Sequence, residues 1–469
     1  MTKTVTYFTD RITEKDKLRK FFQKNDPTTK KVLEINGMHG IGKSQMLKWA
    51  YNQYQPSDII CAFYDFKSST PEKTQFLDML RCIAITNQEQ CSGYDYSNFL
   101  TLSENAQKDN YINENDIQEI VTIFNTSLST HLGNRPMFVF YDTTEEAHPK
   151  TINILNDQIL SHHIDQSNIK FAFSGEKPLY WSSVDIRKRR RSLFLDTFDP
   201  DEMLELIEKV LDKEIFIQLP PSCIEFCLYI SAGNPGILKT SLDFLANYFS
   251  DSPVKWDRDT CQALINHVFQ IFIKEKIISR LHFDDELDKH KLVKHIAMLR
   301  KIDLFPFKSI IANHFQTPFS EKSARYYDYL LNQIFSQSHL FKKIEYSSGY
   351  RINTCFRRMN LMQTFFNDSD EFHLIKQRIQ DYYHNRISIV SGSDLVSAIC
   401  EYLFFKYALI PSSLPISLPT PRDATSELQL LIHQTRPDES AFIQDSYEIS
   451  IEQTIEADED LKPYFEACK

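Results

Sequence analysis

The segment from residue 31 to residue 54, KVLEIN-GMHGIGKS-QMLKWAYNQY, decides the expected fold. Its first six residues form a short strand pattern, the next eight match the glycine-rich pattern G-x-x-x-x-G-K-S, and the remainder has helical spacing. A strand, a glycine loop and a helix in this order let backbone N–H groups surround a phosphate, while the helix N-terminus faces the same anion. The segment therefore predicts a phosphate-binding loop (P-loop) within a parallel α/β sheet flanked by helices.

Glycine is rare in this chain, so its placement is informative. Only 10 of the 469 residues are glycine, and three of them lie in this loop. Glycine leaves room for the backbone to approach a phosphate closely. Lys43 is predicted to reach the β- and γ-phosphates, and the Ser44 hydroxyl to ligate Mg²⁺. The residues predicted to contact the nucleotide here are Gly37, Met38, His39, Gly40, Ile41, Gly42, Lys43, Ser44 and Gln45.

A second apolar run ends in a carboxylate. Residues 137–142 read MFVFYD, which suits a central parallel strand buried on both faces. Asp142 would then lie at the carboxyl edge of the sheet, where ligands bind. We expect Asp142 to help hold Mg²⁺ together with Ser44, and Glu145 or Glu146 to polarise the attacking water. The predicted catalytic residues are Lys43, Asp142, Glu145 and Glu146.

Other parts of the N-terminal half complete this sheet. Further strands are expected at 59–66, 169–173 and 192–195, helices at 75–86 and 116–131, and a polar surface excursion at 87–114. Five consecutive basic residues, Arg187–Arg191, have three open interpretations: a solvated turn, an arginine that acts on a neighbouring subunit's γ-phosphate, or a contact with nucleic acid or another anion.

The C-terminal half is rich in helix patterns. Helices are expected from residue 199 onward, and a hairpin is expected at 341–353 after a helix at 323–338. Three helices with a β-hairpin form a winged helix, a fold that binds DNA in some proteins and only packs in others. Residues 411–421 read as a proline-rich linker. Residues 437–469 contain ten acidic residues and two lysines, so this tail accounts for most of the net charge of −10.

Composition excludes several protein classes. The chain is 42% hydrophobic and 25% charged, which excludes a wholly disordered or fibrous protein. No run of about 18 apolar residues suggests a transmembrane helix, and the N-terminus lacks the apolar region of a secretory signal. The nine scattered cysteines are read as reduced thiols. We therefore expect a cytoplasmic protein without membrane partners.

The order of these parts resembles the STAND class of signal-transducing P-loop ATPases, which includes the NB-ARC and NACHT switch proteins. The resemblance covers residues 5–410. Residues 8–11, FTDR, look like the F-x-G-R-E entry of this class, which implies that Arg11 and its segment lie against adenine. Residues 233–235, GNP, are similar to the G-x-P loop, which implies that Pro235 packs near the base.

Two departures from that class bear on turnover. A glutamate, Glu176, stands where bacterial members often carry an arginine that senses the γ-phosphate. The winged-helix histidine that touches the ADP β-phosphate falls at about Asn353, which donates a hydrogen bond but carries no charge. Both departures affect hydrolysis and ADP locking more than nucleotide binding.

The resemblance implies a division into domains. The predicted domains are an adenine-contacting segment at 1–30, a P-loop ATPase core at 31–198, a helical lid at 199–255, a winged helix at 256–365, a helical extension at 366–410, and a linker with an acidic tail at 411–469. The family's effector and sensor domains are not recognised in this sequence, so we expect them on a separate protein, with the linker and tail either docking that partner or disordered.

Three functions follow from these features. The resemblance implies an ATP/ADP switch that uses Mg²⁺, oligomerises when ligand binds and activates a separate protein partner, with antiviral defence as the implied setting. The first alternative is an AAA+ ATPase that engages DNA through its winged helix. However, the helix expected at 323–338 holds one basic residue, Arg325, where phosphate contacts need several. The second alternative is a nucleotide-locked scaffold without useful turnover.

Overall fold

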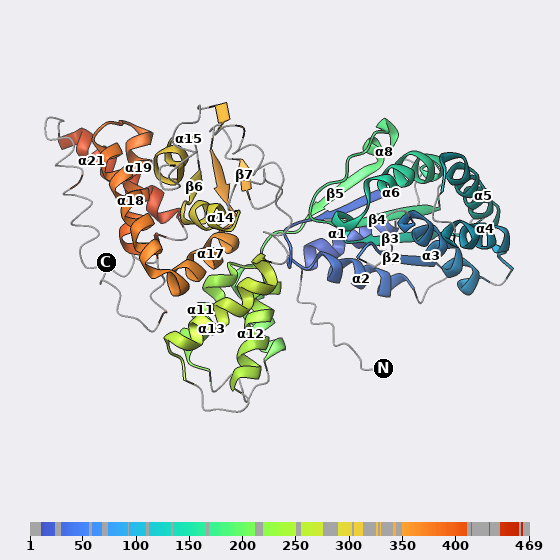
Figure 1. The fold of residues 1–469 in the computed structure, drawn as a ribbon, viewed down its shortest axis with the longest axis horizontal. Coiled ribbons are helices and arrows are strands. Elements are labelled where there is room, and N and C mark those ends of the chain that lie inside the picture. The colour runs from blue at the N-terminus through green and yellow to red at the C-terminus, as the bar shows by residue number, and fades with distance from the viewer. Residues whose placement is uncertain are drawn as a thin grey trace. The chain divides into compact units, whose positions relative to one another are not determined.

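The computed structural model describes most of the chain, as two compact units. The units are Met1–Thr197 and Phe198–Lys469, and each is considered by itself (Figure 1). The described residues are 11–23, 30–55, 59–67, 74–91, 93–108, 112–132, 135–165, 168–211, 219–249, 255–274, 289–302, 304–312, 325–326, 329, 341–343, 349–409, 414, 431, 441–458 and 461–462.

The first unit contains a parallel sheet of five strands. The strands are β1 (Val32–Asn36), β2 (Ile60–Asp65), β3 (Met137–Asp142), β4 (Ile169–Gly175) and β5 (Arg190–Phe194), in the order β2-β3-β4-β1-β5 (Figure 1). Every residue of β1, β3 and β4 is buried, which agrees with their apolar runs and central places. The predicted parallel α/β fold is therefore confirmed.

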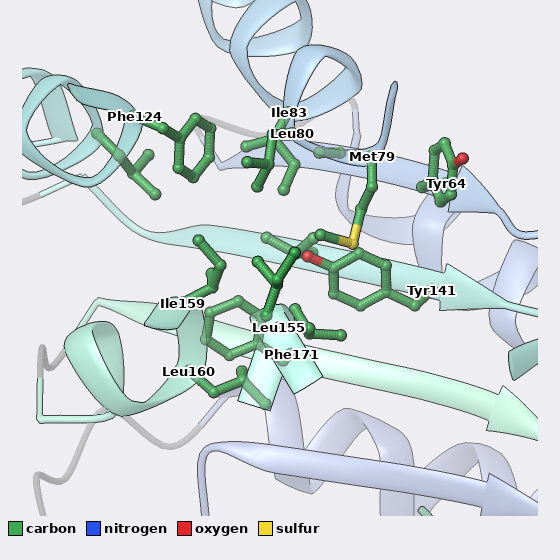
Figure 2. Close-up of a cluster of buried hydrophobic side chains, with 14 of the residues drawn as sticks. Tyr64, Met79, Leu80, Ile83, Phe124, Tyr141, Leu155, Ile159, Leu160 and Phe171 are labelled. Carbon is green, nitrogen blue, oxygen red and sulfur yellow. The ribbon is translucent and has the colours of Figure 1, made fainter. Parts of the chain in front are cut away.

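Helices cover both faces of this sheet. They are α1 (Ile12–Gln23), α2 (Lys43–Tyr54), α3 (Gln75–Gln90), α4 (Ser97–Lys108), α5 (Glu114–Leu132), η1 (Thr144–Glu146), α6 (Pro149–Ile154), η2 (Leu155–Leu160), α7 (Ser161–His163) and α8 (Val184–Arg189). On one face α1 and α2 pack against β1 and β3. On the other face α3, α5 and η2 bury a larger cluster, in which Met79 lies close to Tyr141 and Leu155 close to Phe171 of the sheet (Figure 2).

The polar excursion expected at 87–114 is wrong. Helix α3 continues to Gln90, and α4 occupies Ser97–Lys108. Phe99 is fully buried, with its ring 5.2 Å from that of Phe124 in α5. Leu100, Leu102 and Ala106 of α4 also pack against the same core, so this polar-looking segment forms a packed helix that its weak periodicity does not reveal.

The second unit is mainly helical. Its helices are α9 (Pro200–Val210), α11 (Pro221–Ser231), α12 (Pro235–Phe249), α13 (Arg258–Val268), η3 (Phe269–Lys274), α14 (Lys289–Met298), α15 (Leu304–Pro306), η5 (Phe307–Ala312), α17 (Thr354–Asn367), α18 (Ser369–Ile387), α19 (Ser393–Leu403), η6 (Phe404–Ala408) and α21 (Ala441–Glu456). Helix α17 is the most buried and contacts α11, α13, α14 and α18. The Arg358 side chain of α17 donates to the carbonyl oxygen of Tyr229, 2.9 Å away, near the C-terminal end of α11.

A small antiparallel sheet accompanies these helices. Its strands are β6 (Lys301–Ile302), β7 (Phe341–Lys343) and β8 (Tyr350–Ile352), in the order β6-β8-β7. The pairing of β7 with β8 confirms the expected hairpin. The helix expected at 323–338 lies almost wholly outside the described residues, so the winged helix stays a prediction. The proline-rich linker expected at 411–421 also lies outside them, except for Leu414.

The described part of the acidic tail is folded onto its own unit. Helix α21 packs against α19, and Ile451, Ile455 and Leu461 are buried. Asp458, just after α21, forms an ion pair with Arg300. The tail therefore belongs to the core of the second unit in this structure. No described helix is both long and apolar enough to cross a membrane.

Candidate nucleotide site

The loop between β1 and α2 has the shape of a P-loop. Strand β1 ends at Asn36, and α2 begins at Lys43. A Cβ atom on Gly37 would lie 2.8 Å from the carbonyl oxygen of Leu195, so the neighbouring backbone excludes any side chain there. Gly42 has φ of 100°, a left-handed conformation that glycine adopts without strain. Gly37 is therefore required by the lack of space for a side chain, and Gly42 by its left-handed backbone conformation.

The Lys43 side chain lies against the loop. It is buried, and its Nζ donates to the carbonyl oxygens of Gly37 and Met38 at 2.8 and 2.9 Å. Its charge is therefore held beside the backbone that would surround a phosphate. Among the other predicted contacts, Met38 and Ile41 are buried, whereas Gln45 is exposed on the first turn of α2.

Asp142 and Ser44 come together as predicted, although 98 residues separate them. The Ser44 hydroxyl donates to Oδ1 of Asp142 at 2.9 Å, and the Thr143 N–H donates to the same oxygen at 3.0 Å. Ser174, on the intervening strand β4, also donates to this oxygen. Asp142 is only 1% exposed. A buried carboxylate beside a hydroxyl is a hard oxygen donor set, which fits Mg²⁺.

Glu145 and Glu146 differ in their surroundings. The Glu145 carboxylate accepts from the Glu176 N–H at 3.2 Å, at the end of β4. Reduced hydration and the charge of Glu176 raise the pKa of Glu145, and the nearby charge of Lys43 acts in the opposite direction. The electrostatic environment of the Glu145 carboxylate therefore includes the charges of both Glu176 and Lys43. The Glu146 carbonyl oxygen accepts from the Gln75 side chain at 3.2 Å, and the Glu146 N–H donates to the carbonyl oxygen of Thr143 at 3.0 Å.

Glu176 contacts the P-loop through His39. The two side chains approach to 3.4 Å, from Nδ1 to Oε1. The residue before it, Gly175, has no room for a side chain, because a Cβ atom would lie 2.0 Å from Oγ1 of Thr144. The end of β4, the P-loop and the turn after β3 therefore pack tightly at one edge of the sheet.

The Arg11 side chain bonds the backbone of the P-loop. Its side chain is buried, and its Nη2 donates to the carbonyl oxygens of Ile41 and Asp196 at 3.0 and 2.7 Å. Arg11 also has φ of 31°, a left-handed conformation that is costly for a residue with a side chain. The structure thus shows Arg11 holding loop backbone, and the predicted adenine contact of its segment stays a prediction.

Pro235 and Asn353 lie in the second unit, each at a helix start. The Asn234 side chain caps α12 by accepting from the Gly236 and Ile237 N–H groups, and Pro235 occupies the first turn. The Asn353 side chain caps α17 by accepting from the Phe356 N–H at 3.1 Å. Their predicted contacts with the nucleotide stay predictions.

The basic run is not a turn. Arg187–Arg189 end α8, and Arg190 begins β5. Arg189 pairs with Asp165 at 2.6 Å, and Arg190 pairs with the buried Glu34 at 3.5 Å. Part of the run is therefore paired within the first unit.

The run also lies at the wrong edge for a role in this chain's own site. Arg190 is opposite Val32, at the start of β1, whereas the P-loop follows the end of β1. Four residues of strand separate these points by roughly 13 Å. The readings in which the run acts on a neighbouring subunit or on an external anion stay predictions.

Two site residues were missed by sequence reasoning. Ser174 bonds Asp142, and the buried Gln75 accepts from the His148 N–H at 2.7 Å and donates to Glu146, so it orders the turn after β3. Ser174 could have been predicted, because it precedes a glycine at the end of a strand in the same sheet. Nothing in the sequence marks Gln75, because its role depends on packing.

Comparison with known proteins extends this description. The family model "Nephrocystin 3, N-terminal" matches residues 9–175, less than half of the chain. That span includes the P-loop, Asp142 and four of the five strands of the parallel sheet, β1 to β4. A search of curated proteins finds no match.

Solved structures give distant likenesses. Cdc6p from Pyrobaculum aerophilum is 10% identical with a TM-score of 0.38, and Orc1 from Aeropyrum pernix, solved in complex with DNA, is 8% identical with a TM-score of 0.40. Each covers 78% of this chain and 94% of its own. The RuvB Holliday junction branch migration motor from Thermotoga maritima is 14% identical with a TM-score of 0.34, covering 75% of this chain and 94% of its own. Likenesses this distant say nothing about what this chain binds.

Proposed function

We propose that this chain binds ATP at the P-loop and hydrolyses it with Mg²⁺. The observation that carries the proposal is the convergence of Lys43, Ser44 and Asp142 at the carboxyl edge of the parallel sheet. A buried carboxylate bonded to the P-loop serine has a clear use in a nucleotide site. A structural glycine turn would need neither the serine nor the carboxylate.

The residues have separate tasks in this proposal. Lys43 would bind the β- and γ-phosphates, while Ser44 and Asp142 would hold Mg²⁺. When bound, Mg²⁺ neutralises phosphate charge that builds up during transfer. Glu145, whose raised pKa suits a group that accepts a proton, would orient and deprotonate the attacking water. Geometry favours Glu145 over Glu146, because Glu145 lies at the P-loop edge near Lys43.

We further propose that nucleotide state switches the chain between forms, and that the ATP form oligomerises and activates a separate protein effector. Support comes from the resemblance to STAND ATPases, which aligns Pro235 and Asn353 with residues that contact the nucleotide in that class. Antiviral defence is the setting that this resemblance suggests.

Nucleotide binding is tested by titrating the purified protein with a fluorescent ATP analogue. Lys43→Ala should weaken binding at least 100-fold, because it removes the one side chain expected on the β- and γ-phosphates. Lys48→Ala is the matched control, since Lys48 is exposed on the same helix and should leave affinity unchanged. Equal affinity in the wild type and in Lys43→Ala would overturn the proposed site.

The switch is tested by native mass measurement. The protein with ADP should have a lower mass than the protein with a non-hydrolysable ATP analogue, and Lys43→Ala should abolish the difference. An unchanged mass in both states would refute the oligomerising switch while leaving ATP binding intact. Salt-dependent binding of duplex DNA that stimulates turnover would instead favour the DNA-engaging ATPase.

A further inference from the structure

A cavity of about 830 Å³, open to solvent and lined by both polar and apolar groups, lies in the second unit. Its lining comes from two helices that pack against each other: α19, with Ser393 and Ser397, and α21, with Ser450 and Thr454. A smaller hollow of about 120 Å³ shares its floor and adds Arg357. Sites for small molecules in proteins commonly span roughly 300–1,000 Å³, so this volume suits a ligand of that class.

The floor of the cavity carries charge. Arg300 lies between two carboxylates: both of its terminal nitrogens contact Asp458, and its Nε is 3.4 Å from Oε1 of Glu401. Arg351 lines both hollows, and Arg357 lines the smaller one. Three arginines therefore face two carboxylates, which leaves one net positive charge at the floor.

Two polar groups of this cavity are not used by the protein itself. Arg351 pairs through its backbone in the small sheet, and its side chain makes no hydrogen bond or ion pair with any residue that the structure describes. Glu401 is only 7% exposed, and its Oε2 has no hydrogen-bond partner among those same residues. A buried polar atom without a partner is costly, and such atoms are uncommon in folded proteins. A cation and a hydrogen-bond acceptor thus face the same space.

The ligand must match both groups. A guanidinium fork binds two oxygens of a phosphate at once, so Arg351 and the positive floor suit a phosphate group. The open oxygen of Glu401 needs a hydroxyl or N–H donor. The serine and threonine hydroxyls of the two helices add donors and acceptors for a ligand that carries several hydroxyl groups.

We propose that this cavity binds a small phosphorylated molecule that carries hydroxyl groups, with its phosphate on Arg351 and a hydroxyl donating to Glu401. Nucleoside monophosphates and sugar phosphates share this chemistry. Because α21 lines the cavity, the bound molecule also holds the C-terminal helix against α19. The site is separate from the P-loop, so its failure would leave the proposed ATP site unaffected.

The test uses full-length Lys43→Ala protein, which removes phosphate binding at the P-loop. Calorimetric titrations with AMP, glucose 6-phosphate and inorganic phosphate should show saturable binding of at least one of the two organic phosphates. Arg351→Gln should weaken that binding at least tenfold. Arg187→Gln, the same change at an exposed arginine of α8, should leave it unchanged. Thermal melts of each variant establish that it is folded.

A second variant tests the hydroxyl contact. Glu401→Gln should weaken the organic phosphate at least fivefold, and hydrogen exchange in α21 should slow when ligand binds to the parent protein. No saturable binding of either organic phosphate, or equal binding in Arg351→Gln, would overturn the proposal. Binding of inorganic phosphate alone would overturn it as well, because the site would then not recognise the hydroxyl-bearing part.

Discussion

Two adjacent glutamates show how single residues acquire different roles. The Glu145 carboxylate accepts from the Glu176 N–H at the end of β4, and the charge of Lys43 lowers its pKa against the effect of burial. The Glu146 backbone bonds Gln75 and Thr143. The short helical turn Thr144–Glu146 points consecutive side chains in different directions. Adjacency in sequence therefore does not make these residues interchangeable.

Glu145→Gln should lower the rate of ATP hydrolysis at least 100-fold and leave nucleotide affinity within a factor of three. A glutamine keeps the size of the side chain but cannot accept a proton from water. Glu146→Gln is the matched control and should retain most of the activity. Phosphate release under saturating ATP measures both. Loss of turnover in Glu146→Gln with full activity in Glu145→Gln would reverse this assignment.

The raised pKa of Glu145 also predicts the pH dependence of turnover. The water-activating form is the ionised carboxylate, so kcat should fall as pH falls through this pKa. The decline should begin at a higher pH than the ordinary value for glutamate, about 4.3. A kcat profile measured at saturating ATP from pH 4 to pH 9 tests this. A flat profile down to the ordinary value would contradict it.

At the scale of elements, α1 is held to the sheet by a buried lysine. Lys170 of β4 is 1% exposed, and its Nζ donates to the carbonyl oxygens of Phe21 and Phe22 at 2.7 and 2.9 Å, near the end of α1. A cation at this position also suits the helix dipole. Burial, with Lys31 nearby, lowers the pKa of Lys170 to about 8.

This lowered pKa makes the stability of the first unit depend on pH. Between about pH 8 and pH 10.5, the unfolded state retains a proton that the folded state has released, so the contribution of Lys170 to stability rises with pH. The full rise is up to about 3 kcal/mol. The test is urea unfolding of the wild type and of Lys170→Met at several pH values. The difference between their free energies of unfolding reports the contribution of Lys170, because most other titrating groups are common to both proteins. A constant difference between the two proteins across this range would refute the prediction.

At the scale of the whole molecule, the C-terminal acidic segment is part of the folded second unit. Ile451 and Ile455 of α21 are buried, whereas Ile449 of the same helix is 54% exposed. The pattern shows one face of α21 packed against the unit and another facing solvent. A charged tail therefore also supplies core residues.

Ile451→Ala should lower the free energy of unfolding of the second unit by about 2–4 kcal/mol, since it leaves a cavity in a packed interface. Ile449→Ala, on the exposed face of the same helix, should change it by less than about 0.5 kcal/mol. Chemical unfolding of the full chain measures both. Equal, small effects would show that α21 does not contribute to the fold.

Much of the site was predictable because its motifs are local. The P-loop depends on neighbouring residues, and its glycines, lysine and serine lie within eight positions. Asp142 was predictable because a fully apolar run that ends in a carboxylate has few other uses in a parallel sheet. Helix α4 was missed because its apolar residues, Phe99 with the partly buried Leu100, Leu102 and Ala106, are few and lie among many polar ones.

The sequence by itself determined the parallel sheet, the P-loop and the carboxylate strand, because backbone conformation and burial on both faces follow from short stretches of residue type. Three facts came from the folded chain: Glu145 bonds the end of β4, Arg11 holds the P-loop backbone, and Arg351 and Glu401 share a cavity with α21. These facts depend on contacts between residues far apart in the chain, and no local pattern encodes such contacts.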